Sequence, residues 1–82
     1  SMRVIVLGVT GMLGRSVFEV FSNDHRFDTW GTLRSSSEKR TFSLLFQKKL
    51  VSGVDVQDPD VLIKIIAHLK PQIVINCIGV VK

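Results

Sequence analysis

The 82-residue sequence contains no tyrosine, one cysteine and two prolines. The lack of tyrosine excludes chemistry in which a phenol of this chain acts as an acid or a base. A single cysteine, Cys77, excludes an internal disulfide and a zinc site of several cysteines, so we expect a reducing, cytoplasmic compartment. No apolar run approaches the roughly 18 residues that span a bilayer, and we therefore predict no membrane partner.

Acidic residues are in the minority: eleven Lys and Arg against seven Asp and Glu leave a formal net charge of +4. The basic residues are scattered, and the longest runs are the pairs Lys39-Arg40 and Lys48-Lys49. Aromatic side chains do not alternate with them, as a surface that stacks nucleic-acid bases requires. We therefore predict no nucleic-acid partner, and a small basic nucleic-acid or protein-binding module is the least favoured alternative.

Short apolar runs alternate with amphipathic segments along the whole chain. The pattern predicts strands at 4–7, 27–33, 51–56 and 73–75, a loop at 34–39, and helices from Leu13 to about 22, around 42–50 and from Asp58-Pro59 to about 70. The expected buried stripe of the first long helix is Leu13, Val17, Val20 and Phe21. That of the last helix is Leu62, Ile65, Ile66 and Leu69.

Strands that alternate with helices favour an α/β fold with a parallel sheet and right-handed crossovers. We predict a partial Rossmann fold of about four strands in the order 3-2-1-4, with flanking helices. The fourth strand, Ile73 to Ile75, is then an edge without charge or proline. We expect more chain to follow Lys82, and we expect the fragment to self-associate through this edge.

A glycine loop with the spacing G-x-x-G-x-x-G follows the first strand. Gly8 permits a tight turn, Gly11 lets a pyrophosphate approach the backbone, and Gly14 lets the helix pack closely on the strand. The amides around Gly11, Met12 and Leu13 would point at the phosphates, and we include Thr10 among the cofactor-binding residues. The alternative is a glycine turn that binds no ligand.

Arg34 follows the second strand, where dinucleotide-binding folds place the residue that distinguishes the two nicotinamide cofactors. An acidic residue there binds a ribose 2′-hydroxyl, whereas an arginine accommodates a 2′-phosphate. The sequence therefore favours NADP(H) over NAD(H), and Ser35 offers a further hydrogen bond. The alternative is a solvated basic loop.

Four motifs in register resemble the extended short-chain dehydrogenase/reductase superfamily. They are Gly8 to Gly14, Gly31-Thr32-Leu33-Arg34, Asp55-Val56-Gln57-Asp58 and Asn76-Cys77-Ile78-Gly79. Within the superfamily they are most similar to the branch of dTDP-4-dehydrorhamnose reductase and the sugar-nucleotide epimerases. Family members often have alanines at the positions of Cys77 and Ile78, so the sequence departs from the pattern there.

The resemblance implies roles for residues after the third and fourth strands. In the family, an Asp and the aliphatic residue after it contact the adenine, and the segment after the fourth strand lines the cofactor near the ribose. The matching residues are Asp55 and Val56 for the adenine, and Asn76, Ile78, Gly79, Val80 and Val81 for the ribose side. Asp58 is expected to cap the next helix.

The resemblance also implies what residues 1–82 do and do not supply. We interpret them as the N-terminal part of an NAD(P)-binding Rossmann-like domain, the NADP(H)-binding portion of a sugar-nucleotide reductase or epimerase that acts on a nucleotide sugar. The family's catalytic Tyr-x-x-x-Lys pair and its substrate-binding part are absent, so we predict no catalytic residue, and no metal, in this chain. A non-catalytic NADP-sensing domain of the same superfamily is the alternative.

Overall fold

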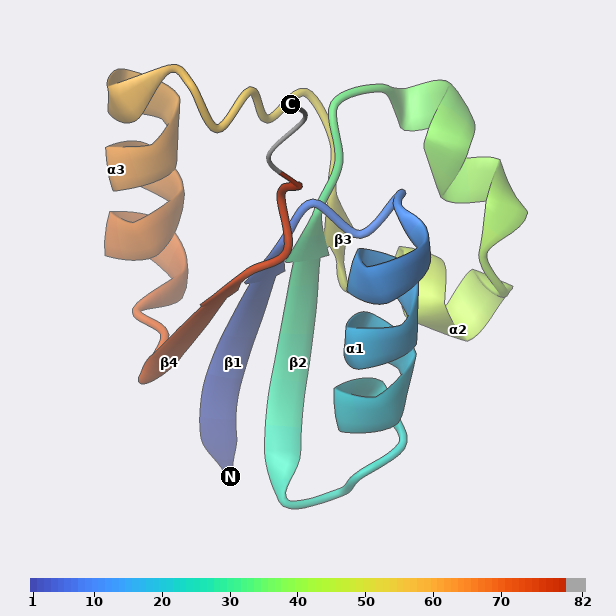
Figure 1. Cartoon of the computed structure of the whole chain (residues 1–82). Coiled ribbons are helices and arrows are strands. Elements are labelled where there is room, and N and C mark those ends of the chain that lie inside the picture. The colour runs from blue at the N-terminus through green and yellow to red at the C-terminus, as the bar shows by residue number, and fades with distance from the viewer. Residues whose placement is uncertain (80–82) are drawn as a thin grey trace.

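The computed structural model describes residues 1–79 and confirms a partial Rossmann-like α/β fold. Its strands are β1 (Met2–Leu7), β2 (Phe27–Thr32), β3 (Leu50–Val51) and β4 (Ile73–Asn76). Its helices are α1 (Met12–Ser22), the 3-10 helix η1 (Ser36–Thr41), α2 (Leu44–Gln47) and α3 (Pro59–Leu69). The four strands form one parallel sheet in the predicted order β3-β2-β1-β4 (Figure 1).

The two faces of the sheet are covered by different helices. Figure 1 shows α1 and α2 on one side of the sheet and α3 on the other. In β1, Val4 and Val6 belong to the core beneath α1, whereas Ile5 and Leu7 belong to the core beneath α3. Because alternate residues of a strand point to opposite faces, β1 is apolar throughout and is buried on both sides.

The face that helix α1 presents to the sheet matches the predicted one in part, because Val17 and Phe21 pack against the core. Leu13 and Val20 are 66% and 68% exposed, while Phe18 is fully buried and Phe21 is half-buried. The buried residues of α1 are Gly14 and Phe18, which lie one turn apart. The buried stripe is therefore rotated around the helix axis relative to the predicted one. The prediction of Leu13 and Val20 as core residues is therefore wrong.

The segment between β2 and β3 also departs from the predictions. The expected loop at 34–39 is partly η1, whose first turn is closed by a capping box between Ser35 and Glu38. The helix expected around 42–50 is reduced to the single turn of α2. The strand expected at 51–56 is only Leu50–Val51, because Gly53 turns the chain at a φ of +74° and its N–H donates to the carbonyl of Arg34.

Helix α3 begins and ends where the sequence predicts. The Asp58 side chain accepts a hydrogen bond from the Asp60 N–H at 3.1 Å, Pro59 occupies the first turn, and the helix ends at Leu69. Leu69 is buried, but Ile66 lies on the exposed side, which corrects one member of the predicted stripe. None of the helices within residues 1–79 is long and apolar enough to cross a membrane.

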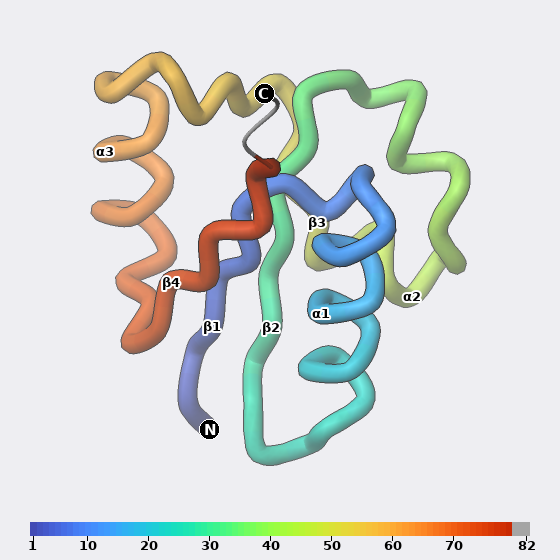
Figure 2. Tube along the Cα trace, viewed as in Figure 1, coloured from blue at the N-terminus to red at the C-terminus, as the bar shows by residue number. Residues whose placement is uncertain are grey.

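The connections that follow β1, β2 and β4 meet at one end of the sheet. Figure 2 shows this end at the top of the view, close to the segment that links β3 to α3, while the N-terminus lies at the opposite end. In an open parallel sheet, the crevice at the carboxyl ends of the strands is where ligands bind. The fold therefore places the four motifs of the sequence beside one another.

Candidate functional site

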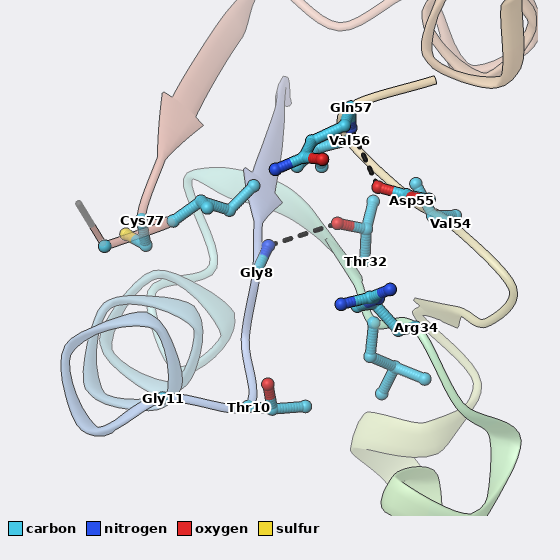
Figure 3. Close-up of a pocket in the computed structure, with 13 residues that line it drawn as sticks. Gly8, Thr10, Gly11, Thr32, Arg34, Val54, Asp55, Val56, Gln57 and Cys77 are labelled. Carbon is cyan, nitrogen blue, oxygen red and sulfur yellow. Dashed lines mark hydrogen bonds between the residues drawn. The ribbon is translucent and has the colours of Figure 1, made fainter. Parts of the chain in front are cut away.

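A pocket of about 300 Å³ opens at the carboxyl ends of the strands (Figure 3). Its walls come from the glycine loop, the end of β2, the β3–α3 connection and the residues after β4. It is lined by Gly8, Thr10, Gly11, Thr32, Leu33, Arg34, Val54, Asp55, Val56, Gln57, Cys77, Ile78 and Gly79.

The glycine loop is tied to strand β2 by two hydrogen bonds. Gly8 has a φ of +80°, which side chains rarely adopt, and its N–H donates to Thr32 Oγ1 at 3.1 Å. The N–H of Val9 donates to the carbonyl of Thr32 at 3.0 Å. Thr32 is only 1% exposed, so both bonds are shielded from water and fix the turn against the sheet.

Gly14 is required by the close approach of α1 to the loop. A Cβ atom at this position would lie 1.9 Å from the Gly8 carbonyl oxygen, far inside van der Waals contact. The predicted reason for this glycine, close packing of the helix on the strand, is confirmed. Gly14 therefore shapes the site from beneath and does not line the pocket.

Gly11 lies in front of the N-terminus of α1 and has open space around it. A Cβ atom there would meet nothing within 4 Å. Gly11 is the N-cap of α1, and neither a side-chain cap nor an acidic residue occupies the first turn. The first amides of the helix thus face open space, an arrangement that suits an anion. The side chains of Met12 and Leu13 are exposed and do not line the pocket.

Arg34 supplies the positive charge of the pocket. It follows β2, and Figure 3 shows it across the pocket from Gly11. Among residues 1–79, no carboxylate forms an ion pair with it. Ser35 lies outside the lining, and its hydroxyl is occupied, since it accepts from the Ser37 N–H at 3.3 Å and contacts the Ser37 hydroxyl at 2.7 Å.

The connection between β3 and α3 forms a short turn at the pocket wall. Asp55 Oδ1 accepts a hydrogen bond from the Gln57 N–H at 2.9 Å, and the Asp55 carbonyl accepts from the Asp58 N–H at 2.9 Å. Val56 stands between these groups and lines the pocket. The turn therefore presents a carboxylate, an aliphatic side chain and a carboxamide to the same space.

The segment after β4 closes the remaining side. Asn76 Oδ1 accepts from the Ile78 N–H at 3.0 Å, and the Cys77 N–H donates to the Leu7 carbonyl at 2.9 Å. Ile78 and Gly79 line the pocket, whereas Asn76 does not line it and holds the turn through its side chain. A Cβ atom on Gly8 would lie 2.7 Å from Ile78 Cγ1, so this segment packs directly on the glycine loop.

The pocket unites just over half of the predicted site residues. The lining includes Gly8, Thr10, Gly11, Arg34, Asp55, Val56, Ile78 and Gly79, and it leaves out Met12, Leu13, Gly14, Ser35 and Asn76. Val80 and Val81 lie outside the described residues. Sequence reasoning missed Thr32, Leu33, Val54, Gln57 and Cys77. Their place in the sequence could have identified them, because each of the five is next to a predicted site residue or at the end of a strand at the same edge of the sheet.

Two close ion pairs share one carboxylate at the opposite end of the sheet. Asp28 accepts hydrogen bonds from Arg3 Nε at 2.7 Å and from Lys49 Nζ at 2.8 Å. Burial raises the pKa of Asp28, but the bonds from Lys49 and Arg3 outweigh it and hold the pKa at about 2. Within the described part of the chain, no three His, Cys, Asp or Glu side chains are grouped to hold a metal ion.

Comparison with known families gave one match. The model of the "NAD dependent epimerase/dehydratase family" matches residues 4–82. This agrees with the resemblance to extended short-chain dehydrogenases/reductases, while the finer similarity to dTDP-4-dehydrorhamnose reductase stays a prediction. Neither the curated proteins nor the solved structures gave a significant match.

Proposed function

The chain belongs to the NAD dependent epimerase/dehydratase family, and on that premise we propose that it binds NADP(H) for a sugar-nucleotide reductase or epimerase. NAD(P) is the dinucleotide of this family, and its substrates are sugar nucleotides in general. The finer proposal is a reductase similar to dTDP-4-dehydrorhamnose reductase, with NADP(H) preferred to NAD(H).

The observation that carries the proposal is the cradle at Gly11. The uncapped start of α1 and a glycine whose Cβ position is open for 4 Å lie together at one pocket. A pyrophosphate needs a close approach to backbone N–H groups and the positive end of a helix dipole. The residues present therefore fit the phosphates of a dinucleotide, with Gly11, Met12 and Leu13 supplying their amides.

The preference for NADP(H) is supported by the charge at the end of β2. Arg34 lines the pocket and has no carboxylate partner among residues 1–79. An unpaired guanidinium can pair with a ribose 2′-phosphate, for which an acidic residue would be repulsive. Ser35 lies outside the pocket lining, and its side chain closes the first turn of η1, which follows Arg34 directly.

The remaining predicted contacts come from the β3–α3 connection and from the segment after β4. We assign Asp55 and Val56 to the adenine side, since a carboxylate oxygen can accept from the exocyclic amine while the aliphatic side chain packs on the ring. Ile78 and Gly79 belong to the ribose side, and Val80 and Val81 are predicted to continue it. Asn76 acts indirectly by holding the turn that presents Ile78.

The proposed role of this chain is to bind and orient the cofactor. The dinucleotide supplies hydride transfer, and the protein supplies position and electrostatics. Because the 82 residues contain no tyrosine, they hold no counterpart of the Tyr-x-x-x-Lys pair that the resemblance implies. We therefore assign no phenol-mediated proton transfer to these residues.

Titration of the chain with NADPH and NADH tests the proposal. We expect NADPH to bind more tightly, and Arg34→Ala to weaken NADPH binding about 10-fold to 100-fold, the value of a charge-assisted hydrogen bond. NADH binding should change by less than about threefold, because NADH lacks the 2′-phosphate. Arg26→Ala is the control, since Arg26 pairs with Asp24 and does not line the pocket. Equal losses for both cofactors would contradict the role of Arg34.

A further inference from the structure

Gln57 places an unused polar group in the pocket. Its side chain lines the pocket, and its carboxamide forms no hydrogen bond to any of residues 1–79. Figure 3 shows the side chain reaching across the pocket toward the end of β1, where Gly8 begins the glycine loop. The orientation exposes both the carbonyl oxygen and the amide nitrogen to a bound molecule.

The backbone that carries this side chain is fixed. The Gln57 N–H donates to Asp55 Oδ1 at 2.9 Å, and this bond is drawn in Figure 3. The next residue, Asp58, donates its own N–H to the Asp55 carbonyl at 2.9 Å and caps α3. Gln57 therefore projects from a turn anchored to a helix, and a ligand would meet a positioned group.

The surroundings of the carboxamide suit a flat ring better than a phosphate. Figure 3 shows Val56 beside Gln57, and Val54 and Ile78 add further apolar side chains to the lining of the same pocket. The groups suited to anions are elsewhere, since Figure 3 shows Gly11 far from Gln57 and Arg34 on a different strand end. A neutral carboxamide beside apolar walls matches a ring that is apolar on its faces and polar at its edge.

A carboxamide presents one acceptor and one donor side by side. Adenine presents the complement at its N6 amine and N7, and glutamine pairs with this edge in two hydrogen bonds, whereas a purine with a carbonyl at that position presents two acceptors there. We infer that Gln57 reads the N6 and N7 edge of the adenine of the bound dinucleotide and, together with the contact between Asp55 and the second amine hydrogen, sets its base specificity. The inference rests on the proposed function, and it adds Gln57 to the binding residues and a selectivity for adenine to the site.

The test compares NADPH with its hypoxanthine analogue, in which a carbonyl oxygen replaces the exocyclic amine. Binding of each to the full 82-residue chain is followed by NMR, for the wild type, for Gln57→Met and for Gln72→Met. Methionine keeps the length of glutamine and removes its hydrogen bonds. Gln72 is the matched control, because it precedes β4 and does not line the pocket.

In the wild type we expect NADPH to bind about tenfold more tightly than the analogue, and its addition to shift the side-chain amide resonances of Gln57. In Gln57→Met this preference falls about threefold, to the part that the contact between Asp55 and the amine supplies, whereas Gln72→Met keeps it. A folded Gln57→Met that retains the full preference overturns this inference and leaves the proposed function standing. A wild type that binds neither dinucleotide overturns both.

Discussion

At the scale of single residues, two glycines of one loop have different roles, one in packing and one in ligand binding. Gly14 allows α1 to touch the Gly8 carbonyl, and Gly11 leaves room for a ligand in front of the helix. The two requirements are separable, because the first concerns the folded protein alone and the second concerns only the bound state. Substitution by alanine therefore distinguishes a structural glycine from a functional one in the same motif.

Gly14→Ala should lower the free energy of unfolding by about 3 kcal/mol, as expected for a backbone clash that must push α1 away. Gly11→Ala should leave the free energy of unfolding within about 0.5 kcal/mol, since the added methyl meets nothing and the φ of −75° is ordinary. It should nevertheless weaken NADPH binding, because the methyl occupies the space of the phosphates. Urea unfolding and NADPH titration of both variants check the pair, and equal stabilities would contradict it.

At the scale of elements, one carboxylate joins several strands at the end of the sheet remote from the pocket. Asp28 in β2 binds Arg3 in β1 and Lys49, which directly precedes β3. Arg3 also donates to the carbonyl of Leu69, the last residue of α3, at 2.9 Å. The cluster therefore fixes the amino ends of the strands, while the carboxyl ends remain available for a ligand.

Asp28→Asn should reduce the free energy of unfolding near pH 7 by about 1 to 2 kcal/mol. The folded-state pKa of about 2 lies below the ordinary 3.8, so the carboxylate stabilises the fold above about pH 4. This contribution declines as the pH falls from 3.8 toward 2. Chemical unfolding at pH 7, 4 and 2.5 measures it, and the difference between wild type and variant should shrink on acidification. A difference that is constant with pH would argue against the ion pairs.

At the scale of the whole molecule, β4 leaves one edge of the sheet without a partner strand among residues 1–79. It pairs with β1 only, and Val74 is 45% exposed. Neither a charged residue nor proline interrupts Ile73 to Ile75. An apolar edge with free backbone groups is a template for pairing with another strand, which motivates the predicted self-association.

The 82-residue chain should therefore sediment as a dimer or larger species at high protein concentration. Val74→Lys should shift it toward the monomer, because a charge at a strand edge opposes pairing. Leu44→Lys is the control, since Leu44 is an exposed aliphatic residue on α2 and lies off the sheet edge. Sedimentation velocity over a concentration series measures the size of the species, and a monomeric wild type would contradict the prediction.

The sequence by itself determined the order of the elements, the topology of the sheet and the positions of its glycines. These follow from local causes: β-branched runs form buried strands, Asp58-Pro59 starts a helix, and Gly8 takes a positive φ. Parallel strands with right-handed crossovers then leave few arrangements. For that reason the loops carrying Gly11, Arg34, Asp55 and Ile78 were expected at one edge.

Tertiary structure decided which face of each helix is buried and which side chains reach the pocket. The contact between Gly14 and Gly8 rotates α1, so that Phe18 is buried and Leu13 is exposed. Gly53 shortens β3, and the turn held by Asp55 directs Gln57 into the pocket. Periodicity describes one segment at a time, whereas these outcomes depend on contacts between segments distant in the chain. The physical reason is that packing selects one face among several that are apolar enough to be buried.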